Sequence, residues 1–162
     1  MMRELIIEAT ETALRAVDAP RYFRTERGFH GRFYCSLQHE LELRGLFRNE
    51  AILEMEYQKS RRHSTWQRPD IVLHVPAEES GAAVNENNYA VWALKHRASR
   101  QEATDDLTLL DEMLELLNYP LGIFVNIAAD DTMIQHYTGR NRDRLAAVAV
   151  WQVNDAIKVR WA

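Results

Sequence analysis

The chain has 162 residues, of which 46% are hydrophobic and 27% are charged, and its net charge is −4. This length and composition predict one globular domain, residues 1–162, and the net charge gives no overall attraction to a polyanion. The apolar runs are far shorter than a membrane span, the charged start differs from a signal peptide, and the single cysteine, Cys35, excludes an internal disulfide and a cysteine zinc site. We therefore expect a cytoplasmic protein that has no membrane partner.

Two amphipathic helices are predicted in the first third of the chain. Residues 1–17 carry apolar side chains at helical spacing, and Asp18-Ala19-Pro20 ends that helix. Thr25 can cap a second helix, which has Glu26 in its first turn and ends near Gly45. At this position Glu26 can act as a surface acid that compensates the helix dipole. Glu40 lies about 21 Å further along the axis, so these two acids cannot serve one site.

Three strands are expected next. Residues 52–57 alternate between apolar and polar, and a basic segment then leads to Pro69, which can open a strand because it needs no N–H there. Asp70 stands before a buried apolar run, where a carboxylate needs a partner: a metal ion, Arg68, or Lys95 in a structural ion pair. Residues 88–97 form the next apolar run, after a Gly- and Asn-containing interval typical of a hairpin loop. If the two strands are antiparallel neighbours, Asp70 and Lys95 lie at the same edge of the sheet.

The remaining elements complete an α/β pattern. Ser99 and Glu102 have the spacing of a helix capping box, and the helix that follows buries regularly spaced leucines. Residues 121–127 are expected to form a buried strand parallel to the Lys95 strand, joined to it by a right-handed crossover. A short helical segment is predicted from Asp130-Asp131, and a final strand pair over 145–153 and 156–161.

The pair of motifs Pro69-Asp70 and Lys95, in this order of elements, resembles the PD-(D/E)xK nuclease superfamily. That resemblance implies a restriction-endonuclease-like core, a mixed central β-sheet flanked by helices in the order αβββαβ, from about residue 25 to residue 127. The family motif has an acid two positions before the lysine, and this chain has Ala93 there.

The resemblance also implies a site and a cofactor. Asp70, Glu26 and the carbonyl of Leu94 would bind Mg²⁺ or Mn²⁺ through oxygen, and Lys95 would orient the attacking water or stabilise developing negative charge. Ala93 supplies no ligand, so the chain is expected to be inactive or impaired as it stands.

Three accounts of Ala93 remain open. It could be an engineered replacement of a glutamate, or mark a natural pseudonuclease. The acid could also have moved to the following helix, where Glu102, Asp105 and Asp106 are candidates.

Basic residues bracket the expected site. Each cluster could be a solvated surface, but two of them flank one strand pair, which favours phosphate contacts. The residues expected to bind nucleic acid are Lys59, Arg61, Arg62, Arg68 and Arg97. The sequence therefore predicts a metal-dependent DNA endonuclease acting on double-stranded DNA, as a homodimer that cuts both strands or within a larger nucleic-acid-processing assembly. The alternative is a catalytically silent nuclease-like domain that binds nucleic acid or a partner protein.

Overall fold

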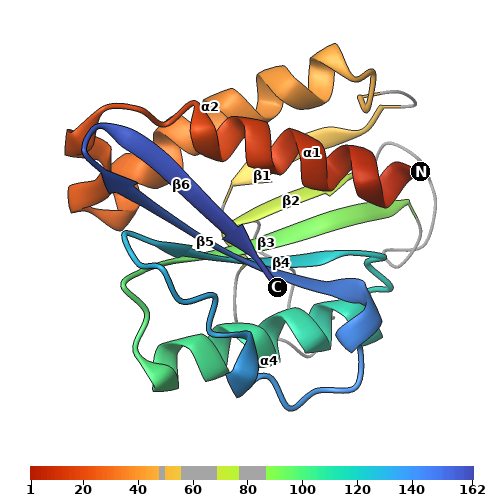
Figure 1. Cartoon of the computed structure of the whole chain (residues 1–162). Helices are drawn as coiled ribbons and strands as arrows, with labels where there is room; N and C mark the ends of the chain where they lie inside the picture. The colour runs from red at the N-terminus through yellow and green to blue at the C-terminus, as the bar shows by residue number, and fades with distance from the viewer. Residues whose placement is uncertain (48–49, 56–68, 77–86) are drawn as a thin grey trace.

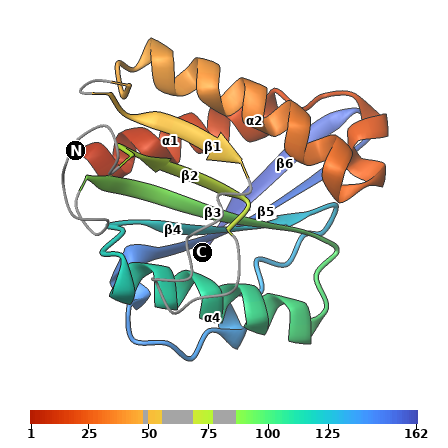
Figure 2. The ribbon, with the colours of Figure 1, turned by 180° about the vertical axis from the view of Figure 1, so that it is seen from behind.

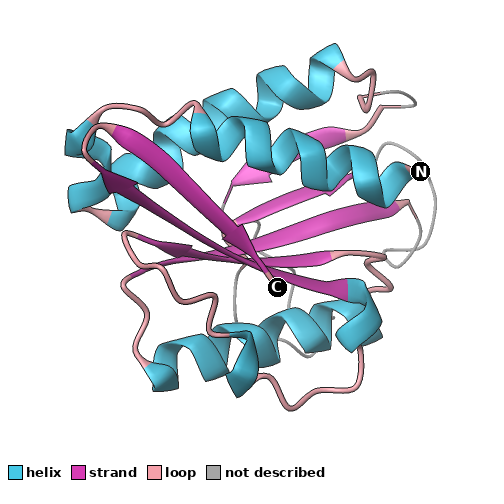
Figure 3. Cartoon of the chain, in the orientation of Figure 1, coloured by secondary structure: helices cyan, strands magenta, loops and turns pink. Residues whose placement is uncertain are grey.

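A computed structural model describes residues 1–47, 50–55, 69–76 and 87–162. They form a six-stranded mixed β-sheet with helices on both faces, an α/β architecture (Figures 1 and 3). Helices α1 (Met2–Arg15) and α2 (Glu26–Leu43) cover one face, and α4 (Arg100–Leu116) covers the other. Seen from behind, the same three layers appear with α4 below the sheet (Figure 2).

The strands lie side by side in chain order, β1-β2-β3-β4-β5-β6. The first three pair antiparallel: β1 (Ile52–Met55), β2 (Ile71–His74) and β3 (Asn88–His96). The next two are parallel to β3: β4 (Gly122–Ile127) and β5 (Leu145–Val153). Strand β6 (Ala156–Trp161) runs antiparallel to β5. Among the described residues, the helices and strands from α2 to β4 follow the order αβββαβ.

The central strands are buried on both faces because the side chains of each strand enter two hydrophobic cores, one on each side of the sheet. Along β3, Trp92 and Leu94 join the core formed with α1 and α2, whereas Val91 and Ala93 join the core formed with α4. This is the two-residue alternation of a strand, and it explains why β3 reads as a continuous apolar run rather than an alternating one.

The helix caps expected from the sequence are present. Thr25 Oγ1 accepts a hydrogen bond from the N–H of Gly28 at 3.1 Å. Ser99 and Glu102 form a complete capping box, which fixes the start of α4 directly after β3. Asn154 and Asp155 both have positive φ and turn the chain between β5 and β6. Two short 3₁₀ turns precede β5 in this part of the chain: η3 (Ile134–His136) and η4 (Arg142–Arg144).

Some predicted features were displaced or lie outside the described residues. The short helical segment expected from Asp130 begins only at Ile134, in η3, because the side chain of Asp131 caps the loop by accepting the N–H of Met133. The basic segment 59–68 and most of the β2–β3 connection are outside the described ranges. None of the helices in those ranges is long and apolar enough to span a membrane.

Candidate active site at the ends of β2 and β3

Asp70 lies at the start of β2 and is joined to β3 by its side chain. Its Oδ2 accepts the N–H of Leu94 at 2.6 Å, and its own N–H donates to the carbonyl of Trp92. Burial raises the pKa of the Asp70 carboxyl, although the Leu94 N–H, His30 and Lys95 each act to lower it. Because the N–H and C=O of a strand residue point to the same side, the Leu94 carbonyl also faces the Asp70 edge.

Glu26 reaches the same edge from the first turn of α2. Its Oε2 accepts the N–H of His96 at 3.1 Å and lies 4.0 Å from Lys95 Nζ. His30, one turn further along α2, has a buried Nε2 with no hydrogen-bond partner among the described residues. Glu40, further along α2, forms an ion pair with Arg44, the residue that follows the helix, so Glu26 is the one of these two acids that reaches this edge.

Lys95 lies between carboxylates that come from both layers of helices. Its Nζ is 4.0 Å from Glu26 and 3.8 Å from Asp106 Oδ2, and its side chain is 27% exposed. Desolvation opposes the charge on Lys95, but the carboxylates of Asp106, Glu26 and Asp70 outweigh it and raise the pKa of the lysine. Lys95 thus remains a cation, and its ion pairs are with the two helix acids rather than with Asp70.

Asp106 is the acid that α4 brings to this site. Its side chain is only 21% exposed, and the buried Oδ2 has no hydrogen-bond partner among the described residues. Burial raises the pKa of Asp106 to about 7, with Asp70 and Glu26 acting in the same direction and Lys95 against it. The Oδ2 atom of Asp106 thus lacks the hydrogen bond that usually compensates the burial of a carboxylate oxygen.

The other two acids of this helix that were candidates from the sequence, Glu102 and Asp105, have different roles. Glu102 closes the capping box, and exposed Asp105 accepts a hydrogen bond from Gln101. The spacing of the buried residues along α4 distinguishes Asp106 from Glu102 and Asp105. The buried positions Ala103, Leu107 and Leu110 recur at intervals of three and four, and residue 106 falls in the same stripe.

Ala93 faces α4 from the strand. It is 1% exposed and belongs to the core cluster that includes Ala103 and Leu107. Lys95, two residues further on, points toward the same helix through its contact with Asp106. Strand β3 thus presents a methyl group to α4, and α4 presents a carboxylate to the end of β3.

The donor set suits a hard cation, but only in part. Carboxylate and carbonyl oxygens are the ligands that Mg²⁺ prefers. Asp106, Glu26 and Asp70 lie near the single ammonium of Lys95, and Asp106 Oδ2 has no hydrogen bond among the described residues. Within residues 1–47, 50–55, 69–76 and 87–162, however, no group of three or more His, Cys, Asp or Glu side chains is arranged to hold a metal ion. The residues offer a cation partial ligation rather than a closed cage.

The basic residues expected to bind nucleic acid are placed only in part. Lys59, Arg61, Arg62 and Arg68 lie outside the described residues. Arg97 follows β3 directly and is exposed. Comparisons of the chain with protein-family models, with curated proteins and with solved structures found no match.

Proposed function

We propose that this chain is a metal-dependent DNA endonuclease of the PD-(D/E)xK type, in which Asp106 replaces the acid that the motif lacks at Ala93. The observation that carries the proposal is the position of Asp106: a buried carboxylate, 3.8 Å from Lys95, with one oxygen that no described residue satisfies. Two further features support it. Asp70 and Lys95 come from adjacent antiparallel strands, and the elements from α2 to β4 have the order αβββαβ.

The chain's own residues divide the chemistry between them. Asp70, Asp106 and the Leu94 carbonyl, with Glu26 nearby, would hold Mg²⁺ or Mn²⁺. A bound ion of this kind polarises the scissile phosphate and lowers the pKa of the attacking water. Lys95, kept charged by its acids, can stabilise negative charge that develops on the phosphate. Burial raises the pKa of Asp106 to about 7, so this carboxyl has to lose its proton before it can ligate the ion.

The packing around Ala93 favours the account in which the acid has moved to the helix. A glutamate at position 93 would enter a closed core cluster and place a second carboxylate on the side of β3 that Asp106 already faces. Two like charges in one buried site raise each other's cost of ionisation. Under this account the chain is active as it stands, and Ala93→Glu adds nothing.

Cleavage of supercoiled plasmid in Mg²⁺ or Mn²⁺ tests the proposal. We expect Asp106→Asn, Asp70→Asn and Lys95→Ala each to lower the rate by about a hundredfold or more, in line with the removal of one electrostatic group from a catalytic site. Asp105→Asn is the matched control, because it removes an exposed carboxylate from the neighbouring position of the same helix. Equal rates for Asp106→Asn and Asp105→Asn would refute the role of Asp106.

Metal binding provides a second measurement that does not depend on turnover. Since Asp106 is partly protonated near pH 7, metal binding there should release protons. Calorimetric titration with Mn²⁺ in buffers of different ionisation enthalpy measures that release. We expect it to disappear in Asp106→Asn and to persist in Asp105→Asn.

The alternative function is a catalytically silent nuclease-like domain that binds nucleic acid or a partner. One observation favours it: the described acids do not converge into a three-ligand site, and Lys95 is held by ion pairs. This alternative predicts no calorimetric metal site and no cleavage by the unmodified chain, whereas duplex DNA would still bind with strong salt dependence.

A further inference from the structure

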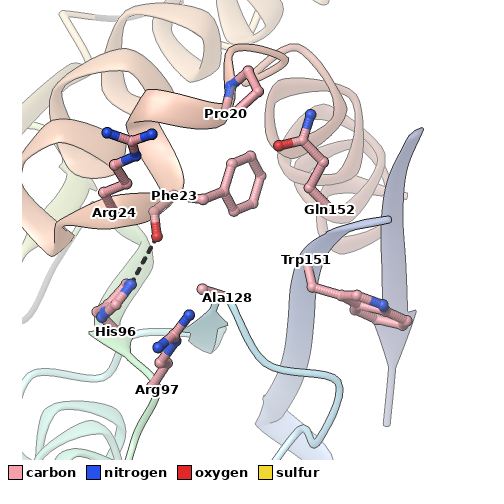
Figure 4. A pocket seen from close by; sticks show the side chains of 8 residues that line it. All are labelled: Pro20, Phe23, Arg24, His96, Arg97, Ala128, Trp151 and Gln152. Atoms are coloured by element: carbon pink, nitrogen blue, oxygen red, sulfur yellow. Dashed lines mark hydrogen bonds between the residues drawn. The ribbon is translucent and has the colours of Figure 1, made fainter. Parts of the chain in front are cut away.

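A pocket opens at the carboxyl ends of the three parallel strands, beside the Lys95 site (Figure 4). Its volume is about 450 Å³, within the range of small-molecule sites. Each parallel strand contributes to it, and the 3₁₀ turn η1 (Pro20–Arg24) covers it. The lining residues are Pro20, Phe23, Arg24, His96, Arg97, Ala128, Trp151 and Gln152. In open α/β sheets, the carboxyl ends of the strands are where ligands bind.

Two residues that line this pocket have a left-handed backbone conformation. Arg97 follows β3 with φ 51°, and Ala128 follows β4 with φ 57°. Each is held by a hydrogen bond to the next strand, from Arg97 N–H to Ile127 O and from Ala128 N–H to Val150 O, both at 2.8 Å. Non-glycine residues rarely adopt positive φ, and such residues cluster at functional sites.

The pocket is cationic on one side. Arg24, His96 and Arg97 lie along that side in Figure 4, and no acid is among the lining residues. No carboxylate of the described part of the chain forms an ion pair with Arg24 or Arg97. The ring of His96 is fixed because its Nε2 donates to the carbonyl of Phe23 at 2.8 Å. Guanidinium groups that no described carboxylate pairs with suit a phosphate.

The remaining walls suit a flat, partly polar ring. The Phe23 ring lies between Pro20 and Gln152 in Figure 4, where it is buried against Phe29, and half-buried Trp151 forms the far wall with the more accessible aromatic surface. Aromatic surface can stack on a nucleobase, and the amide of Gln152 can donate to or accept from its edge. A phosphate alone would leave this half of the pocket unused.

We propose that this pocket binds one nucleotide, with its phosphate on Arg97 and Arg24 and its base against Trp151 and Gln152. Lys95 and Arg97 are two Cα steps apart, about 7 Å at most. A strand cut at Lys95 would therefore place a neighbouring nucleotide in the pocket. That last assignment rests on the proposed nuclease function, whereas the ligand class of the pocket does not.

Calorimetry without metal, in EDTA, tests the ligand class with three probes: thymidine 5′-monophosphate, thymidine and inorganic phosphate. We expect the monophosphate to bind more tightly than either part alone. Arg97→Ala should weaken monophosphate binding about tenfold or more, the effect of one charge-assisted contact. Arg97→Asn provides a second variant that tolerates positive φ, so that a loss shared by both variants reflects the missing guanidinium.

Arg100→Ala is the matched control, because Arg100 is exposed at the start of α4 and does not line the pocket. Equal affinity in the Arg97 and Arg100 variants, or inorganic phosphate binding as tightly as the monophosphate, would overturn the proposal. Cleavage assays on the unmodified chain separate this proposal from the nuclease proposal. Nucleotide binding by an unmodified chain that does not cleave plasmid DNA supports the pocket and removes only the nuclease function, and Asp106→Asn should bind the monophosphate as the unmodified chain does because Asp106 does not line the pocket.

Discussion

Two aspartates of helix α4, Asp106 and Asp111, are in opposite circumstances. Asp111 Oδ1 accepts hydrogen bonds from the Tyr137 hydroxyl and from both the N–H and the side-chain amide of Asn141. Burial works against its ionisation, but these hydrogen bonds outweigh it and hold the pKa of Asp111 below its usual range. Asp106 has one lysine 3.8 Å away and a buried oxygen without a hydrogen bond, and its pKa is raised to about 7.

The difference separates a structural acid from a candidate catalytic one. Asp111 ties the segment before β5 to the helix, and its partners account for its charge. Among the described residues, Asp106 Oδ2 has no hydrogen bonds like those of Asp111, so burial of this carboxyl lowers the free energy of unfolding. A functional role would account for its retention. Perturbed carboxylates near a cation are the expected signature of a functional site.

The largest expected effect is the loss of unfolding free energy when Asp111 is replaced. Asp111→Ala leaves three donors without their acceptor and should lower the free energy of unfolding by about 2–3 kcal/mol. Urea denaturation measures the change. Asp105→Ala, which removes an exposed acid from the same helix, should remain within about 0.5 kcal/mol of the unmodified chain. A neutral result at Asp111 would show that its hydrogen bonds are not structural.

The free energy of unfolding should depend on pH in opposite directions through these two aspartates. The contribution of Asp111, whose pKa is lowered, rises with pH, and that of Asp106, whose pKa is raised, falls. Its folded pKa is raised, so between about pH 4 and pH 7 the folded state holds a proton that the unfolded state has lost, and stability falls as the pH rises. Asp106→Asn removes this loss. The variant should therefore gain about 2 kcal/mol on the unmodified chain between pH 5 and pH 7, and little more above that range. Parallel stability curves would contradict the raised pKa.

The smallest expected effect is the loss of unfolding free energy when one hydrogen-bond donor to Asp111, the Tyr137 hydroxyl, is removed. Tyr137→Phe removes one of the donors to Asp111 and leaves the two from Asn141, so it should cost about 1 kcal/mol of unfolding free energy. Burial and the hydrogen bond to Asp111 raise the pKa of Tyr137 to about 12. Spectrophotometric titration should find that Asp111→Asn lowers this pKa, and an unchanged value would mean that burial alone sets it.

The main elements of the fold were accessible from the sequence because they depend on local patterns. The caps Thr25 and Ser99, the Asn154-Asp155 turn and the apolar runs of β2 to β6 were all expected and are present. The antiparallel pairing of β2 with β3 was also expected, and it brings Asp70 beside the residue before Lys95. The short helix expected from Asp130 was displaced, because a side-chain cap at Asp131 takes precedence there.

Sequence by itself thus determined which residues form strands and helices, since periods of 2 and 3.6 are written locally, and it named Asp70, Glu26 and Lys95 as neighbours. Tertiary structure alone showed which of Glu102, Asp105 and Asp106 comes close to Lys95, because that depends on how α4 packs along β3, where Ala93 and Leu107 share one core. It also formed the pocket for which we propose a nucleotide. Arg97 and Trp151 are far apart in the chain, and only the parallel alignment of β3, β4 and β5 brings their strand ends together.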